Sequence, residues 1–212
     1  MNMKTSVAGI TVPDTRMVQL ALQLAQNRYE PCLLQHCWRT YYFGALLGKT
    51  RGWRFDSEVL FLACLLHDLG LTDHFMGSLP FEIQGAQAAK SILAAHGYPA
   101  NKTRQVWNGI AMHPLAIAEF QVPSIRLVAA GAAADVLGDG LRAIPAHATR
   151  AVLAAHPRLA FKKKFVASCA RVAGKYPLAA ARNFLRDIGD RHVPGFHEPN
   201  ICDGIAKAPF KD

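Results

Sequence analysis

The sequence lacks any apolar run of the roughly 18 residues that a membrane-spanning helix needs. The longest candidate, from Leu127 to Gly138, is too short and contains Asp135. The first ten residues carry one Lys and no adequate apolar core, so they do not form a secretory signal. We therefore expect a protein that neither crosses nor binds a membrane.

Cysteine is also scarce. The chain has five cysteines, an odd number, and no Cys-x-x-Cys pair. This argues against a disulfide framework or a zinc ribbon and favours a reducing compartment. We expect a cytoplasmic protein.

A third absence is that of alternating apolar and polar residues, the pattern of half-buried strands. Instead, the sequence is rich in Ala and Leu, with 51% hydrophobic and 18% charged residues. Its apolar residues recur at helical spacing, and prolines mark short connections. We predict an all-α fold in a single domain spanning 1–212, with a helical core over about 13–192 and an irregular tail over 193–212. One helix is expected to start at Pro31, and a later one to run from Pro177 to about Arg191.

Acidic residues are few, which leaves a net charge of +9. Eleven of the 24 Lys and Arg residues lie between Leu141 and Arg191, beside two Asp, so the excess positive charge lies there. Such a segment attracts nucleic acid or another anionic partner, or it forms the solvated faces of amphipathic helices. No recognition motif accompanies it, so nucleic acid is not the expected partner. The sequence leaves open the role of this segment and whether the chain forms a homo-oligomer.

The most informative stretch is an apolar run that ends in His67-Asp68 and then Gly70. Its apolar spacing predicts a buried helix, and Gly70 suits the left-handed position that closes one. A buried carboxylate is costly unless it is hydrogen-bonded, paired with a cation or bound to a metal. A capped helix end with a satisfied histidine is the alternative to a metal site.

Two further helices each present a ligand of the same kind. His36 shares a helix face with Arg39 and Phe43, and Asp135 is an isolated acid among alanines. A structural partner for Asp135, such as Arg126 or Arg39, would be an ordinary explanation. Taken together, His36, His67, Asp68 and Asp135 suit one divalent cation: zinc, iron or manganese.

The order His, His-Asp, Asp on successive helices resembles the HD-domain superfamily of metal-dependent hydrolases. The likeness extends over His36–Gly44, Cys64–Gly70, Phe81–Ala86 and Arg186–Phe196, where it is closest to the cyanamide hydratase-type branch. The resemblance implies a compact HD-domain helical bundle with His36, His67, Asp68 and Asp135 as metal ligands. It also implies zinc as the metal and the addition of water to a small nitrile, as in the conversion of cyanamide to urea.

One departure from the superfamily pattern narrows this expectation. HD proteins with two metals usually have a histidine at the place of Phe81, four residues before Gly85-Ala86. We therefore expect one metal ion. His113 is then either an acid or base beside the metal or an ordinary histidine at a helix end.

Further residues complete the predicted site. His113, His74 and Asp73 are candidates to protonate the substrate, while Arg39 and Glu82 are candidates to bind it. Four aromatic residues would make the pocket small and dry: Trp38, Phe43, Phe75 and Phe81.

Two other functions stay open. One is a phosphohydrolase acting on nucleotides or other phosphomonoesters, with Arg39 as the phosphate clamp, although the chain has no glycine-rich phosphate loop. The other is a non-catalytic basic binding module.

Overall fold

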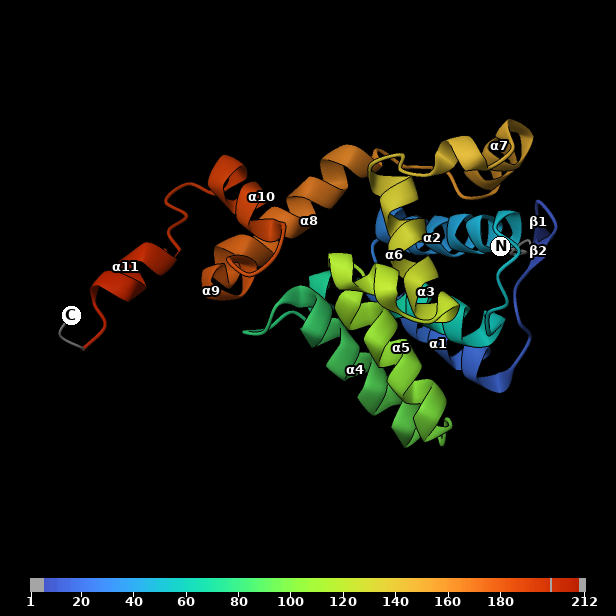
Figure 1. Ribbon diagram of the computed structural model, residues 1–212, viewed down its shortest axis with the longest axis horizontal. Helices are drawn as coiled ribbons and strands as arrows, with labels where there is room; N and C mark the ends of the chain where they lie inside the picture. Colours follow the sequence, from blue (N-terminus) through green and yellow to red (C-terminus); the bar gives the residue numbers. More distant parts are fainter. Residues whose placement is uncertain (1–5, 199, 210–212) are drawn as a thin grey trace.

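The computed structural model describes residues 6–198 and 200–209, and Figure 1 shows its helices. These residues form eleven α-helices, three short 3-10 helices and one hairpin of two-residue strands. The predicted all-α class is confirmed. Within the described ranges, no helix combines the length and the apolar character that a membrane crossing demands.

The elements follow one another along the chain with short connections. The strands are β1 (Ser6–Val7) and β2 (Ile10–Thr11). The α-helices are α1 (Arg16–Arg28), α2 (Pro31–Thr50), α3 (Ser57–Leu66), α4 (Phe81–Ala95), α5 (Ala100–Met112), α6 (Pro123–Val136), α7 (Ala146–Ala155), α8 (Phe161–Lys175), α9 (Pro177–Ala180), α10 (Leu185–His192) and α11 (Ile201–Ala206). The 3-10 helices are η1 (Leu69–Leu71), η2 (Ala116–Phe120) and η3 (Leu141–Ala143).

Local sequence signals account for several of these boundaries. Pro31 and Pro123 occupy the first turns of α2 and α6, where a missing N–H costs nothing. The Asp56 carboxylate accepts hydrogen bonds from the first amides of α3. Gly97 follows α4 with a φ of +72°, the left-handed conformation that ends many helices.

Other boundaries differ from the sequence-based expectation. The β1–β2 hairpin was not expected, because two-residue strands leave no alternating pattern to detect. The predicted helix over 177–191 is two helices, α9 and α10, separated by a turn. The tail after Val193 is not wholly irregular, since it contains α11.

The core is built around α2, whose residues from His36 to Gly48 are all buried, and α2 packs along α6. Glycines allow the two backbones to approach closely. A Cβ atom at Gly131 would lie 2.1 Å from the carbonyl oxygen of Thr40, and one at Gly44 would lie 2.6 Å from that of Leu127. This approach brings the N-terminal half of α2, with His36 and Arg39, beside the end of α6, where Asp135 lies.

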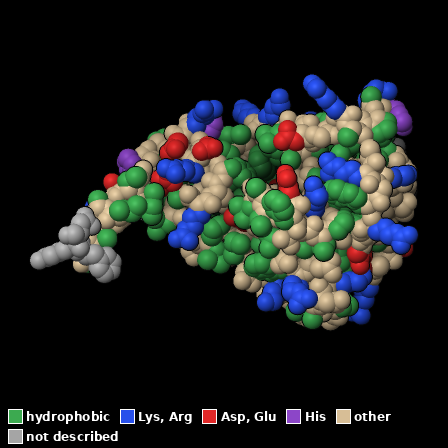
Figure 2. Space-filling view, viewed as in Figure 1, with side chains coloured by type: hydrophobic (Ala, Val, Ile, Leu, Met, Phe, Trp, Pro, Cys, Tyr) green, Lys and Arg blue, Asp and Glu red, His purple; other side chains and the backbone are tan. Residues whose placement is uncertain are grey.

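The C-terminal third extends along one side of this bundle. Helix α8 contacts α2, and α9 and α10 pack against α8 (Figure 1). Helix α11 projects away from the body, with Ile201 and Ile205 exposed. Figure 2 shows many Lys and Arg side chains along the edge that α7 and α8 form, so much of the basic segment faces solvent.

Candidate metal centre

Three potential ligands come from two helices of the buried core. His36 lies in the second turn of α2, and His67 follows the last residue of α3. Asp68 comes next, immediately before η1. Each of these residues is 1% exposed, so the imidazoles and the carboxylate share a dry environment.

Their ligand atoms converge on one point. The Nε2 atoms of His36 and His67 are 3.2 Å apart. The Oδ2 atom of Asp68 lies 3.5 Å from Nε2 of His36 and 3.3 Å from Nε2 of His67. This is the group of His, Cys and acidic residues in the described chain whose spacing could hold a metal ion.

The hydrogen bonds around the group orient it for a cation. The Nδ1–H of His67 donates to the carbonyl of Cys64 at 2.8 Å, and that of His36 donates to Asp135 Oδ2 at 2.7 Å. With Nδ1 of each ring engaged in this way, the two Nε2 atoms face each other. Oδ2 of Asp68 is buried and has no hydrogen-bond partner. A divalent cation between the three atoms would satisfy all of them, so these residues fit a metal site.

The titration behaviour of the group agrees with this fit. Burial, assisted by the neighbouring His36, lowers the pKa of His67 to about 3. His67 is therefore neutral near pH 7, the form in which histidine binds metals. Burial raises the pKa of Asp68, opposed by His36 and His113, because a carboxylate in an apolar layer is poorly solvated.

Asp135, the fourth predicted ligand, is not part of the three-residue group. Arg39 donates from Nε and Nη2 to its two oxygens at 2.7 and 2.8 Å, and Arg158 donates to Oδ1 at 2.7 Å. Burial would raise the pKa of Asp135, but the hydrogen bonds from His36 and Arg39 outweigh it and hold that pKa well below its usual range. Asp135 thus lies behind His36, with its oxygens engaged.

The turn after His67-Asp68 differs from the expectation for Gly70. Gly70 does not adopt the left-handed conformation, and it lies inside η1 rather than at the end of α3. Its role is a close approach: a Cβ atom there would lie 2.0 Å from the carbonyl oxygen of Phe81. The glycine lets α4 pack directly against the turn that follows Asp68.

A cavity of about 340 Å³ opens onto the group. His36, His67, Asp68 and His113 are the polar residues among the twelve that line it. The other lining residues are apolar: Pro114, Ala129, Ala132, Ala133, Val136, Leu137, Phe165 and Phe184. No Lys or Arg is among the twelve, so this wall offers no cation to an anionic substrate.

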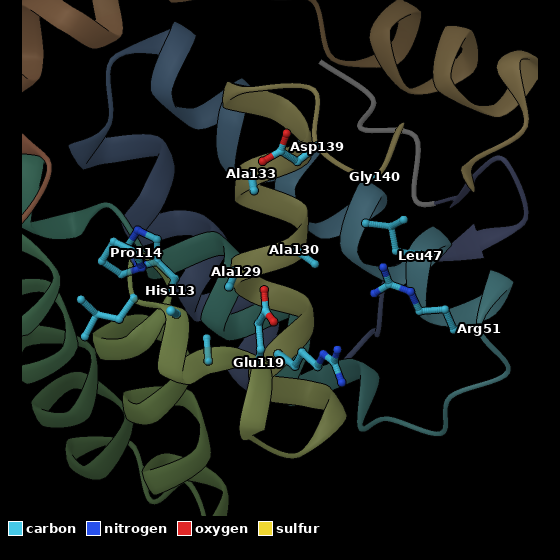
Figure 3. Close-up of a pocket in the computed structure, with 14 residues that line it drawn as sticks. Leu47, Arg51, His113, Pro114, Glu119, Ala129, Ala130, Ala133, Asp139 and Gly140 are labelled. Carbon is cyan, nitrogen blue, oxygen red and sulfur yellow. The ribbon is translucent and has the colours of Figure 1, made fainter. Parts of the chain in front are cut away.

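His113 lies at the junction of this cavity and a second one of about 350 Å³, and both also share Pro114, Ala129 and Ala133. Figure 3 shows the second cavity along α6, with His113 and Pro114 on one side of the helix and Arg51 on the other. The Nδ1–H of His113 donates to the carbonyl of Ile110 at 2.7 Å. Burial, and then His67, lower the pKa of His113 to about 3. His113 therefore presents a neutral imidazole to the cavity.

The other two candidates for substrate protonation do not line the cavity. Asp73 is exposed and pairs with Arg171 at 3.1 Å. His74 lies in the same loop, against the ring of Phe75. Of the three candidates, the structure places His113 alone beside the group.

The predicted substrate-binding residues also lie off the cavity wall. Arg39 is 0% exposed, and besides Asp135 it donates to the carbonyls of His156 and Pro157. Three of the aromatic residues, Trp38, Phe43 and Phe81, are core residues, and Phe75 is partly buried against the core. Glu82 is buried and accepts a hydrogen bond from Asn183 at 2.7 Å.

The sequence-based analysis missed several residues that shape the site. Phe161 stacks on His36 with ring centroids 4.7 Å apart, and Phe165 and Phe184 line the cavity. Arg158, which donates to Asp135, lies in the connection before α8, and no sequence pattern links the two residues. The repeat of aromatics at 161 and 165, one helical turn apart, was the available signal for a packed aromatic face.

Comparison with known proteins shows the family to which these residues belong. Residues 33–137 match the family model described as the HD domain, a range that contains His36, His67, Asp68 and Asp135. The chain belongs to the HD-domain superfamily. Among curated proteins, this HD-domain chain is similar to the cyanamide hydratases DDI2 and DDI3 of Saccharomyces cerevisiae. It is 26% identical to each over 90 residues, which is 41% of this chain.

The matched region spans 40% of the length of each yeast relative. The likeness supports the cyanamide hydratase-like branch of the superfamily. Together with the His-His-Asp group, it supports a metal-dependent hydrolase or hydratase.

Proposed function

We propose that this HD-domain chain is a mononuclear metal-dependent hydratase that adds water to the C≡N group of a small uncharged molecule, with cyanamide as the reference substrate and urea as its product. The observation that carries the proposal is the His36, His67 and Asp68 group at the wall of a cavity without cationic side chains. The yeast cyanamide hydratases supply the reaction type.

Three protein ligands with an open position are typical of catalytic zinc sites. A bound zinc ion would supply the Lewis acidity that makes water a nucleophile near neutral pH. The chain's own part is to hold that ion with three buried ligand atoms and to keep bulk water away. In the balanced reaction, the water oxygen forms a bond to the nitrile carbon, one C–N π bond is converted into an N–H bond, and proton transfer gives the amide.

We assign the movement of that proton to His113, which lines the same cavity as the His-His-Asp group. Its Nδ1 is occupied by the carbonyl of Ile110, so Nε2 is the nitrogen available to take a proton from water and pass it to the substrate nitrogen. Burial, and then His67, lower the pKa of His113 to about 3, so its imidazole is neutral near pH 7 and must release at once any proton that it takes up. Substitution by Asn should leave zinc content unchanged and lower kcat by about 100-fold or more.

The phosphohydrolase alternative finds less support. The predicted clamp, Arg39, is fully buried and has donors bound to Asp135 and to two carbonyls. A phosphate at the group would meet the Asp68 carboxylate without a compensating side-chain cation on the cavity wall. Arginines in the second cavity, Arg51 and Arg126, stack on Trp53 instead.

The test is a parallel assay of the zinc-loaded chain on cyanamide and on a panel of nucleoside monophosphates. We expect urea formation that is lost in Asp68→Asn and in His67→Ala, and no release of phosphate. Faster phosphate release, lost in the same variants, would replace this proposal with the phosphohydrolase.

A further inference from the structure

The cavity beside the His-His-Asp group is larger and more apolar than cyanamide needs. Cyanamide has three non-hydrogen atoms, whereas the cavity measures about 340 Å³. Pockets of about 300–1,000 Å³ enclose ligands of much greater size. A three-atom substrate would leave most of the wall without a contact.

The wall has a deep part and a rim, both apolar. Ala132 and Phe165 are each 8% exposed and lie deep. Leu137 and Phe184 are 73% and 37% exposed, so they form the rim. A substrate entering past them would meet apolar atoms from the rim to the group.

Two structural features keep this wall in place. On α8, Phe161 stacks on Phe165 with ring centroids 4.9 Å apart, and Phe165 faces Phe184 at 6.4 Å. On α6, small side chains at Ala129, Ala132 and Ala133 leave the space that the cavity occupies. The aromatic row and the alanines thus form a defined apolar slot rather than a loose surface.

We propose that the substrate is an uncharged nitrile or substituted cyanamide that carries an aliphatic or aromatic group, and that this group occupies the slot between α6 and α8. The inference rests on the proposed hydration of a C≡N bond and specifies what is attached to it. Anionic substituents are excluded because the wall provides neither Lys nor Arg, and cationic ones because its one carboxylate, Asp68, is assigned to the metal. Burial of an unpaired charge is costly.

The expected size of the preference follows from the hydrophobic effect. Each buried methylene contributes enough to raise kcat/KM about fourfold. A series of straight-chain nitriles should therefore gain by that factor per carbon until the slot is full. Cyanamide, which buries almost no apolar surface, should be the weakest substrate of the set.

The test uses the zinc-loaded full chain, with cyanamide, acetonitrile, butanenitrile, hexanenitrile and benzonitrile as substrates. Calorimetric binding of the corresponding amides to the zinc-free chain gives a second readout, which does not depend on turnover. We expect kcat/KM and amide affinity to rise together along the series, with the negative heat-capacity change of apolar burial.

A matched pair of variants locates the effect. Ala133→Leu fills the slot and should lower kcat/KM for hexanenitrile at least tenfold more than it lowers kcat/KM for cyanamide. Ala130→Leu is the control, because Ala130 lies on the same helix and lines only the second cavity. Melting temperature and zinc content confirm that each variant is folded and loaded.

The outcomes separate the two proposals. Cyanamide turnover that equals or exceeds that of every nitrile, with no effect of Ala133→Leu, overturns the apolar slot and leaves the hydratase. Amide affinity that rises along the series and falls in Ala133→Leu, without hydration of any nitrile, supports the slot and overturns the hydratase. If the chain neither binds the amides nor hydrates any nitrile, both proposals are overturned.

Discussion

Arg39 and Asp135 form a bidentate ion pair inside the core, where both side chains are 0% exposed. Asp135 in turn accepts the Nδ1–H of His36 at 2.7 Å. One arginine on α2 therefore fixes a carboxylate on α6, and that carboxylate fixes the orientation of a candidate metal ligand. Arg158 completes the arrangement from the connection before α8.

Removing the Arg39 side chain should be strongly destabilising. Arg39→Met leaves Asp135 buried with one arginine fewer, and breaking a buried pair from one side costs about 3–5 kcal/mol. Urea unfolding of the metal-free chain measures this loss. Arg158→Met, at a side chain that is 33% exposed, should cost less than half as much. If the two variants lost the same free energy of unfolding, Arg39 would not be the main partner that stabilises Asp135.

Asp135→Asn distinguishes a ligand from a residue that acts through His36. If Asp135 only orients His36, zinc stays at about one per chain and its affinity falls about 10- to 100-fold. Asp68→Asn removes a member of the group itself and should abolish stoichiometric zinc. Competition with a chromophoric chelator gives both affinities. Complete loss of zinc from Asp135→Asn would instead support the prediction from sequence that Asp135 is a ligand.

The buried His156 should make the metal-free chain acid-sensitive. Burial, and then the charge of Arg39, lower its pKa to about 4, below the value of about 6.5 for an exposed histidine. Between these two values the unfolded chain binds a proton that the folded chain does not, so stability falls as pH is lowered through this window. The contribution is about 1.4 kcal/mol per pH unit.

Urea unfolding at several pH values from 4 to 7 measures that slope. His156→Gln should make the slope shallower by roughly one proton. His96→Gln, at an exposed histidine on the far end of α4, is the control and should leave the slope unchanged. An unchanged slope in His156→Gln would assign the acid sensitivity to other groups, such as His67 and His113, whose pKa values are also lowered.

Gly131→Ala tests the close approach of α2 and α6. The new methyl group would lie 2.1 Å from the carbonyl oxygen of Thr40, so the helices must separate. We expect a loss of about 3 kcal/mol and weaker zinc binding. Gly204→Ala in α11, where an added Cβ meets nothing within 4 Å, should cost no stability. Thermal unfolding of the two variants side by side provides the comparison.

The sequence predicted the features that are local. Helical periodicity, the proline positions and the buried His67-Asp68 pair each depend on residues that are close together in the sequence. His36 was found because it shares a helix face with Arg39, and Arg39 was one of the two structural partners considered for Asp135. The other, Arg126, stacks on Trp53 at 4.5 Å.

Features that depend on how helices pack were not predictable in this way. Phe165 and Phe184 reach the cavity only because α8 and the segment before α10 lie against the bundle. The aromatic residues near His36 in sequence, Trp38 and Phe43, point into the core instead. The break between α9 and α10 was also not predictable, because the residues between the two helices include no proline or glycine.

The contact between Gly44 and Gly131 also bears on how the chain opens. Amides at the centre of two helices in backbone contact exchange with solvent mainly through global unfolding. His36 and the Asp135 that orients it lie on these helices, so both belong to the slowest-exchanging part of the chain. On warming, we therefore expect metal release and cooperative melting to coincide, while the amides of α11 exchange freely throughout.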